Sequence, residues 1–378
     1  MHKADIKPHY HEDTGTWSYL VSDPGTGRAA LVDPVLDFDP KSGRTSTTAA
    51  EALLASVQAG GWSVDWILET HAHADHFSAG HWFKRHFPAA TLAIGQGIRQ
   101  VQKAFRPIFN LGEHFPVDGS QFDHLFADDE RFAIGVLEAR VIPVPGHTSD
   151  SVAYLVGDAL FTGDSLFMPD GGTARCDFPG GSAATLFRSI QRLYRLPEHT
   201  RVFVCHDYGP GGREPRCETT IGEQKRGNIH VREDTPEAEY VALREARDAT
   251  LAMPTLMLPA VQVNIRAGAL PEPDSTGINA NVVQDSPALS TLPADVWQLD
   301  GLFKLHLDHY LFVNTEFNLR IPQADKLQSI YVRQSRRVIS GEIHYLDHPH
   351  LGIVLQIRRY ELPPEPVNEL EVPATELQ

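Results

Sequence analysis

The sequence is poor in cysteine, which limits the classes of protein to which it can belong. It has three cysteines in 378 residues, Cys176, Cys205 and Cys217, and none of them forms a CxxC pair. Three are too few for a disulfide framework in a chain of this length, so we expect reduced thiols. The class of small, disulfide-stabilised secreted domains is excluded.

Long apolar stretches are missing as well. No run approaches the roughly 18 apolar residues that cross a bilayer, and the N-terminal stretch MHKADIKPHYHEDTG lacks the apolar segment of a secretory signal. We therefore predict a soluble, cytoplasmic protein with no membrane span. At this length, one large domain and one smaller domain are expected.

Basic residues are outnumbered by acidic ones. Lysine and arginine total 33 against 49 aspartates and glutamates, which gives a formal net charge of -16. Binding to nucleic acid or to an anionic membrane needs a basic surface, so neither is an expected partner. An anionic small substrate would require arginines or lysines placed close to its site.

Histidine, by contrast, is concentrated in one short stretch. Residues 70 to 76 read THAHADH, with three histidines and one aspartate. Imidazole nitrogens and carboxylate oxygens are ligands that zinc and iron accept, and the close spacing lets several side chains converge on one ion. The alternative interpretation is a solvated loop or a helix N-terminus.

Four predicted strands favour the metal interpretation, because each leads directly to a residue of the same kind. In α/β proteins, ligands bind at the carboxyl ends of the strands. The strands and their terminal residues are 64–70 with His71, 140–146 with His147, 159–164 with Asp164, and 201–205 with His206.

The remainder of the N-terminal part follows the same α/β pattern. Turn residues, helix-capping residues and the spacing of apolar residues indicate its elements. They are a β-hairpin of strands 17–23 and 28–34, helices over 45–61, 76–87 and 183–196, and a strand over 91–95.

The composition divides the chain into parts. Residues 1–270 form the expected α/β domain, and the proline- and serine-rich stretch 271–292 is typical of a linker. Apolar and polar residues alternate from Leu311 onward, so 293–362 is predicted to be a small antiparallel β-rich domain. The acidic, proline-rich tail 363–378 is expected to be disordered.

The order of the candidate ligands resembles the signature of a known superfamily. The series is His71, His73, Asp75, His76, His147, Asp164 and His206. This HxHxDH pattern with three later positions is similar to that of the metallo-β-lactamase superfamily, over about residues 10 to 275. The resemblance implies an α/β fold, the αβ/βα four-layer sandwich, with the metal site at one edge between two sheets.

The resemblance also implies two metal subsites. His71, His73 and His147 would form one of them, and Asp75, His76 and His206 the second, with Asp164 bridging the two. This arrangement points to a dinuclear enzyme with two Zn(II) per chain, a thioester hydrolase of the glyoxalase II type.

The residues after Asp164 favour a different branch. The Arg-x-Asp-Phe element, Arg175, Asp177 and Phe178, looks like that of the persulfide dioxygenases, also called sulfur dioxygenases. That branch implies a single Fe(II) per chain, held by His71, His147 and Asp164 as a facial triad with open positions. His73, Asp75, His76 and His206 would then surround the ligands and orient them.

The same resemblance implies a reaction and its participants. Glutathione persulfide would be oxidised by O2 to sulfite, with release of glutathione, by a homodimer. Arg175 would bind a glutathione carboxylate, or alternatively would pair with Asp177. Tyr208 would donate a hydrogen bond near the sulfur, or alternatively would only pack beside the site. Tyr208 and Asp75 are thus the predicted catalytic residues, and Arg175 and Tyr208 the predicted substrate-binding residues.

The C-terminal segment is similar to another family. Residues 295 to 362 resemble the C-terminal part of the CsiV-like family, which is periplasmic and binds peptidoglycan. This resemblance implies contact with peptidoglycan through the C-terminal segment, and it disagrees with the cytoplasmic location. A further hypothesis is therefore a cell-wall binding protein with a vestigial enzyme domain.

Overall fold

The computed structural model divides the chain into two compact units, residues 1–285 and 286–378, each described here by itself. The residues that it describes are 3–40, 43–109, 111–271, 299–307, 311–323, 326–338, 343–348 and 351–356. In this part of the chain, no helix has both the length and the apolar character to cross a bilayer. The predicted linker beyond Pro271 and the predicted disordered tail lie outside the described residues.

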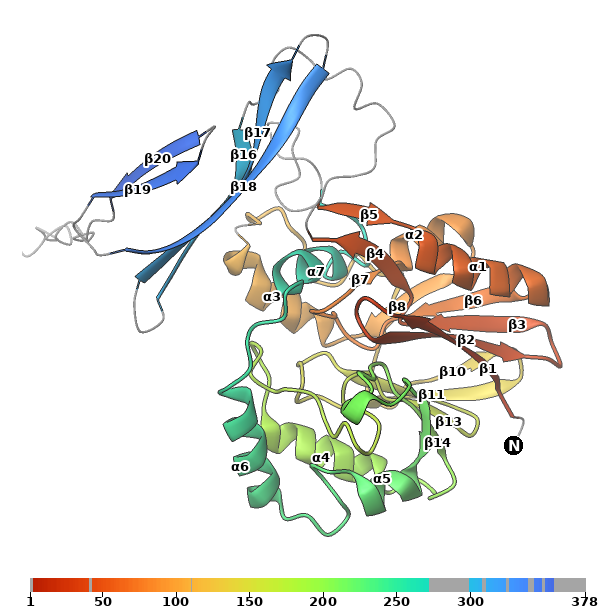
Figure 1. Ribbon diagram of the computed structural model, residues 1–378. Helices are drawn as coiled ribbons and strands as arrows, with labels where there is room; N and C mark the ends of the chain where they lie inside the picture. Colours follow the sequence, from red (N-terminus) through yellow and green to blue (C-terminus); the bar gives the residue numbers. More distant parts are fainter. Residues whose placement is uncertain are drawn as a thin grey trace, which may run out of the picture. The chain divides into compact units, whose positions relative to one another are not determined.

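The first unit contains two six-stranded sheets (Figure 1). The first begins with an antiparallel meander, which includes the predicted hairpin, and continues with parallel strands. Its strands, in spatial order, are β1 Asp5–His11, β2 Thr16–Asp23, β3 Arg28–Val32, β6 Ser63–Leu68, β8 Thr91–Gly95 and β9 His124–Phe126.

The second sheet is antiparallel except for one parallel pair, β13 with β14. Its strands, in spatial order, are β10 Arg131–Ile134, β11 Leu137–Pro143, β12 Val152–Val156, β13 Ala159–Phe161, β14 Arg201–Phe203 and β15 Glu218–Thr220. A small third sheet joins β5 Arg44–Ser46, β4 Val35–Asp39 and β7 Phe77–Ser78.

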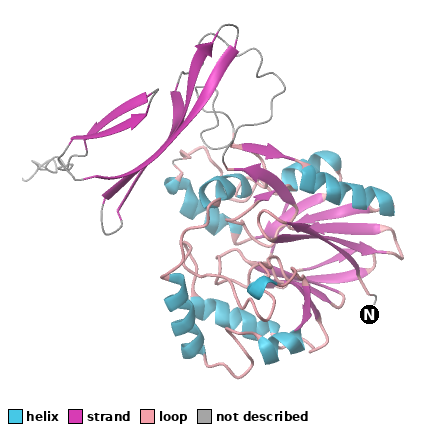
Figure 2. Ribbon diagram, viewed as in Figure 1, coloured by secondary structure: helices cyan, strands magenta, loops and turns pink. Residues whose placement is uncertain are grey.

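Helices lie on the outer faces of the two large sheets (Figure 2). Those packed on the first sheet are α1 Thr48–Gly60, α2 Gly80–His86, α3 Ile98–Ile108 and α7 Met257–Asn264. Those beside the second sheet are α4 Ala183–Leu193, α5 Ile221–Gly227 and α6 Glu237–Asp248. A short 3-10 turn, η1 Pro210–Gly212, follows β14.

Alternation along the central strands explains the four layers. In β6, Ile67 contacts the core under α1, whereas Leu68 contacts the core between the two sheets. In β3, Leu31 likewise contacts the core under α1, and Val32 contacts the core between the two sheets. Because successive side chains point to opposite faces, a strand that is apolar on both faces must be covered on both. The predicted αβ/βα four-layer sandwich is therefore confirmed.

One predicted helix begins later than expected. The pattern over 76–87 predicts a helix throughout, but α2 begins at Gly80. Phe77 and Ser78 instead pair with Leu36 and Val35 of β4. This pairing joins segments that are some forty positions apart, which a local pattern does not reveal.

The second unit is an antiparallel β structure, as predicted. Its first sheet contains β16 Leu299–Leu307, β17 Leu311–Gln323 and β18 Lys326–Val338, and its second contains β19 Ile343–His348 and β20 Leu351–Gln356. Val313 and Thr315 of β17 are 0% exposed. The alternation from Leu311 onward therefore marks a buried face.

Candidate metal centre

The stretch THAHADH forms a buried loop between β6 and β7. His71, His73 and His76 are each at most 1% exposed, and the next helix begins only at Gly80. The alternative of a solvated loop or a helix N-terminus is therefore wrong. Burying three imidazoles is costly unless their polar atoms find partners, so the contacts of this loop matter.

Asp33, which directly follows β3, is the first anchor of the loop. Its Oδ1 accepts hydrogen bonds from the backbone N–H of Thr70 at 2.7 Å and from Nε2 of His73 at 3.0 Å. Burial raises the pKa of Asp33 to about 6, so the carboxylate is ionised at neutral pH and accepts both bonds. The proton of His73 is thereby placed on Nε2, which leaves the lone pair on Nδ1.

Asn264, at the end of α7, is the second anchor. Its side-chain amide donates to the carbonyls of His73 and His76, both at 2.8 Å, and its Oδ1 accepts from the N–H of Ser78 at 2.8 Å. Asn264 is 4% exposed. One buried amide thus satisfies three backbone groups of a loop that lies 191 positions earlier in the sequence.

Two imidazoles and one carboxylate form the first group of candidate ligands. Nε2 of His71 lies 3.7 Å from Oδ2 of Asp164, and Nε2 of His147 lies 3.5 Å from the same oxygen. Nδ1 of His147 donates to the carbonyl of Arg175 at 2.6 Å, which leaves the lone pair on Nε2. One ligand atom from each member lies within 4.8 Å of the others.

A second group lies beside the first. It consists of His73, Asp75, His76 and His206, whose ligand atoms also lie within 4.8 Å of one another. Nε2 of His206 is 3.2 Å from Oδ2 of Asp75 and 3.3 Å from Oδ1 of Asp164, so Asp164 connects the two groups. The structure brings all seven residues of the predicted series together.

The cluster contains polar atoms that a metal ion would satisfy. Among the described residues, twelve buried side-chain nitrogen and oxygen atoms have no hydrogen-bond partner, and six of them belong to this cluster. They are His71 Nε2, His73 Nδ1, Asp75 Oδ1, His76 Nε2, Asp164 Oδ1 and His206 Nε2. Unsatisfied buried polar atoms are rare in native proteins, so this concentration fits a cation-binding site.

The pKa values at the cluster suit a cation as well. Burial, and then His73 and His147, lower the pKa of His71 well below its usual range. Burial lowers the pKa of His147 to about 4, so both rings are neutral at pH 7 and each has a lone pair. Burial raises the pKa of Asp164 to about 7, and a bound cation would lower it by stabilising the carboxylate.

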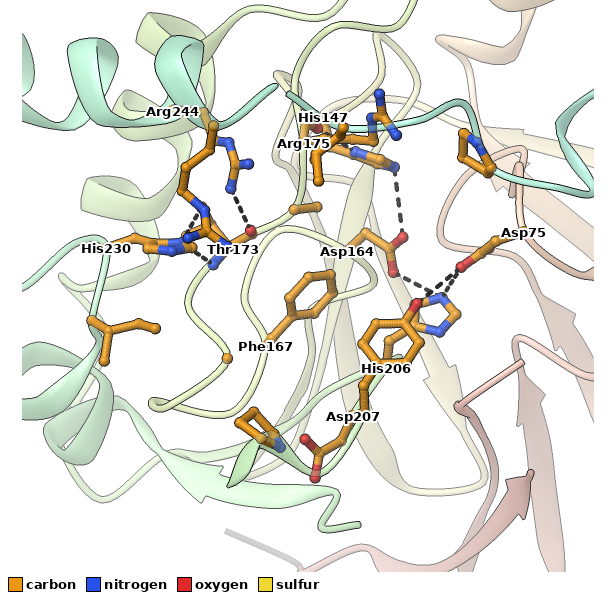
Figure 3. Close-up of a pocket in the computed structure, with 18 of the residues that line it drawn as sticks. Asp75, His147, Asp164, Phe167, Thr173, Arg175, His206, Asp207, His230 and Arg244 are labelled. Atoms are coloured by element: carbon orange, nitrogen blue, oxygen red, sulfur yellow. Dashed lines mark hydrogen bonds and ion pairs between the residues drawn. The ribbon is translucent and has the colours of Figure 1, made fainter. Parts of the chain in front are cut away.

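A pocket of about 510 Å³ opens from the cluster. Asp75, Asp164 and His206 lie at one end of the view in Figure 3, and His230 lies at the other. Phe167 lies between the two ends. Space for a small organic molecule therefore adjoins the candidate ligands.

Arg175 lies on the wall of this pocket, but most of its guanidinium group is occupied. Its Nε and Nη2 donate to the two carboxylate oxygens of Asp177, both at 2.6 Å, and Nη1 donates to the carbonyl of Ala252 at 2.7 Å. The structure thus contains the alternative raised from the sequence, an ion pair with Asp177. A substrate carboxylate would have to bind the remaining N–H groups of Arg175.

Tyr208 contacts the cluster from its open side. Its hydroxyl donates to Oδ2 of Asp75 at 3.4 Å, and its ring stacks on His206 with the ring centroids 5.8 Å apart. Tyr208 is 64% exposed and lines the pocket. The two predicted catalytic residues, Asp75 and Tyr208, are therefore in contact with each other.

The cysteines near the site are packed thiols. Cys176 is 7% exposed, and burial, with a further effect of Asp248, raises its pKa to about 12. Burial also raises the pKa of Cys205 well above its usual range. Neither thiol carries the thiolate that nucleophilic chemistry at neutral pH requires.

Sequence reasoning did not identify several residues that shape the site. Asp33 and Asn264 anchor the loop, and His230, Arg244 and Arg247 line the far part of the pocket. Asn264 had one visible signal, because it is a polar residue within the apolar stretch AVQVNI. The arginines of α6 look like any exposed charges in the sequence.

Comparisons with known proteins agree with this geometry. A family model described as "Metallo-beta-lactamase superfamily" matches residues 11–206. Glyoxylase B2 of Dictyostelium discoideum is 48% identical over 278 residues, which cover 73% of this chain and 95% of that protein.

Two further relatives extend the comparison. A Beta-lactamase hydrolase-like protein of Agrobacterium fabrum is 56% identical over 267 residues, and the chain spans 61% of that protein's length. Among solved structures, ETHE1 from Myxococcus xanthus has a TM-score of 0.56 and 28% sequence identity, covering 70% of this chain and 100% of that one. The C-terminal strands lie outside the family match.

Proposed function

The chain belongs to the metallo-beta-lactamase superfamily, and from this membership and the geometry of the metal centre we propose that it is a non-haem Fe(II) persulfide dioxygenase. Glutathione persulfide, O2 and water would be converted into sulfite and glutathione. One observation carries the proposal: His71, His147 and Asp164 form a compact group of two imidazoles and one carboxylate.

Three further observations support this assignment: a sequence element, a structural likeness and the number of candidate ligands. The Arg175, Asp177 and Phe178 element resembles that of the persulfide dioxygenase branch and lies on the pocket wall or beside it. The likeness to ETHE1 from Myxococcus xanthus extends over the whole of that chain. The first group presents only three protein ligands, which is typical of iron sites that leave positions open for other molecules.

The iron, when bound by His71, His147 and Asp164, would supply open positions for O2 and for the terminal sulfur, and the electrons that activate O2. The protein's contribution is orientation. The carbonyl of Arg175 accepts the Nδ1 proton of His147, and the hydroxyl of Thr70 lies 3.1 Å from Nδ1 of His71. These contacts fix which nitrogen of each ring faces the centre.

In this proposal, the second group orients Asp164 and does not bind the iron. Burial disfavours a charge on His206, but Asp164 and Asp75 outweigh burial and raise its pKa. Nε2 of His206 lies between the two carboxylates, and Tyr208 donates to Asp75 from the pocket side. We infer that this arrangement orients Asp164 and that the hydroxyl of Tyr208 would be a proton donor for a substrate in the pocket.

A second candidate function has an observation of its own. Each member of the group His73, Asp75, His76 and His206 has a buried atom without a hydrogen-bond partner among the described residues. Four such donors suit a second metal ion, and the relative from Dictyostelium discoideum is named Glyoxylase B2. The alternative is thus a dinuclear zinc thioester hydrolase of the glyoxalase II type.

Metal analysis combined with an oxygen electrode tests the proposal. The full chain, purified without added metal, is expected to contain about one iron per chain and to consume O2 when glutathione persulfide is added. Two zinc ions per chain and no persulfide-dependent O2 uptake would overturn the dioxygenase assignment in favour of the hydrolase.

The remaining assignments concern location and assembly. We infer a cytoplasmic location from the unpaired cysteines. We infer a homodimer from the family resemblance. Peptidoglycan contact through the C-terminal strands is a separate proposal, which rests on sequence resemblance alone. Sedimentation of residues 286–378 with purified peptidoglycan tests it, and a segment that stays in solution would contradict it.

A further inference from the structure

The end of the pocket away from the metal centre is cationic. Thr173, His230 and Arg244 meet there (Figure 3), and Arg247 also lines the pocket. We call these four residues the cationic end. The whole chain has a net charge of -16, so positive charge at this end of the pocket depends on which of its arginines have no acidic partner.

Most arginines that line the pocket are already neutralised. Arg244 is 2% exposed, and its Nε and Nη2 lie 2.9 Å and 2.6 Å from Oδ1 of Asp248. Arg175 is paired with Asp177. Each of these pairs contributes little net charge to the pocket.

Arg247 differs from these two arginines. Its side chain has no ion pair or hydrogen bond to any residue that the structure describes, although it lines the pocket from the last turn of α6. It is close enough to His230 to lower that residue's pKa, after burial and Arg244. Arg247 is therefore a free guanidinium group that faces the pocket.

His230 adds an unused donor to the same region. Its Nδ1 accepts a hydrogen bond from the N–H of Thr173 at 2.9 Å, so the ring proton of the neutral imidazole is on Nε2. His230 is 6% exposed, and its Nε2 has no hydrogen-bond partner among the described residues. A buried N–H without an acceptor is unfavourable.

The backbone at Gly172 packs directly against the imidazole ring of His230. Gly172 has a φ of +80°, and a Cβ added to it would lie 2.1 Å from Nδ1 of His230. The backbone thus approaches the ring at a distance that a side chain would prevent. The position and tautomer of His230 are fixed by the chain before any ligand arrives.

We propose that the cationic end binds the carboxylate of an acidic thiol peptide, with Arg247 forming the ion pair and His230 offering a second donor. The inference deepens the proposed function and rests on it for the identity of the reacting sulfur, which would lie at the metal centre. Arg247, rather than Arg175, is the specificity-determining residue, because among the described arginines that line the pocket it alone keeps its planar donor edge free for a bidentate carboxylate contact.

Calorimetric titration of the full chain with reduced glutathione tests the inference without relying on turnover. Arg247→Gln is expected to raise the Kd about tenfold or more, the usual effect of losing a charge-assisted hydrogen bond. Arg247→Lys should recover part of the affinity, since it keeps the charge but not the planar donor edge. Because Arg247 is exposed, neither substitution disturbs the core.

Arg188→Gln is the matched control. It removes the same charge from α4, where Arg188 pairs with Glu237 and does not line the pocket, and it should leave the Kd unchanged. Glutathione diethyl ester, in which both carboxylates are masked, should bind the wild-type chain and Arg247→Gln equally weakly. An unchanged Kd for glutathione in Arg247→Gln would overturn the inference.

The outcomes separate this inference from the proposed function. If glutathione binding depends on Arg247 but no persulfide-dependent O2 uptake is found, the carboxylate site stands and the dioxygenase assignment fails. If O2 uptake is found while Arg247→Gln binds glutathione and turns over its persulfide as the wild type does, the dioxygenase stands and the carboxylate site fails.

Discussion

At the scale of single residues, the metal centre is organised by which nitrogen of each imidazole is engaged elsewhere. His73 donates its Nε2 proton to Asp33, and His147 donates its Nδ1 proton to the carbonyl of Arg175. The other nitrogen of each ring is thereby left with its lone pair. The ligands are thus oriented by partners behind them, and each such partner is a place where the site can be tested.

Replacing His147 and His206 separately distinguishes one metal from two. His147→Ala should abolish the proposed iron binding, because it removes one of the three candidate ligands in the first group. His206→Ala should leave iron bound and mainly lower kcat. Iron content is measured by plasma emission spectroscopy, and an equal loss of metal in both variants would point to a two-metal site.

The pH dependence of stability tests the environment of His230. Burial, with Arg244 and Arg247, lowers its pKa to about 4 from the model-peptide value of about 6.5. Between these values the unfolded chain binds a proton that the folded protein does not, so the free energy of unfolding falls as the pH falls from about 6.5 to about 4. The stability that the neutral form of His230 contributes is fully present above about pH 6.5.

Urea titrations at neutral and at mildly acidic pH measure this effect. His230→Gln keeps an acceptor for the N–H of Thr173 but cannot titrate, so its free energy of unfolding should fall less steeply between the two pH values than that of the wild type. Parallel pH dependence in the two proteins would show that His230 titrates normally in the folded state.

At the scale of elements, α7 supports the metal centre although none of its residues is a candidate ligand. Its terminal Asn264 ties the loop between β6 and β7 to the rest of the first unit through three hydrogen bonds. The strands contribute differently, because the residues that follow β6, β13 and β14, namely His71, Asp164 and His206, lie close together. Strands place the ligands, and a helix that comes late in the chain fixes the loop between them.

Asn264→Ala tests this role of α7. The substitution leaves three buried backbone groups without partners, so we expect a loss of about 2 to 4 kcal/mol in the free energy of unfolding and weaker metal binding. Gln262→Ala is the control, since the side chain of Gln262 bonds only to the carbonyl of Leu258 in its own helix. Equal stability of the two variants in urea would contradict the anchoring role.

At the scale of the whole molecule, the chain consists of two units with different internal construction. The first unit, residues 1–285, contains the family match, the metal centre and the pocket. The second, residues 286–378, contains the antiparallel strands β16 to β20. All seven candidate ligands and every pocket residue precede Gly268 in the sequence.

Truncation at the boundary between the units tests their independence. A chain that ends at Asp285 should have the same metal content as the full chain and the same persulfide-dependent O2 uptake as proposed for it, because no candidate ligand or pocket residue is removed. The comparison uses equal protein concentrations and the same oxygen-electrode assay. Loss of metal from the truncated chain would show that the second unit supports the site.

The sequence by itself predicted the four-layer sandwich, the antiparallel strands of the second unit and the seven residues of the metal cluster. The antiparallel strands follow from local periodicity and the expectation of a metal site from polar residues at strand ends, whereas the four-layer sandwich and the full series of seven residues follow from the resemblance of the HxHxDH pattern to the metallo-β-lactamase superfamily. The tertiary structure alone decided that His73 faces the centre through Nδ1, that Asn264 anchors the loop, and that Arg247 rather than Arg175 has a free guanidinium group. Each of these depends on contacts between positions far apart in the chain, which no local pattern encodes.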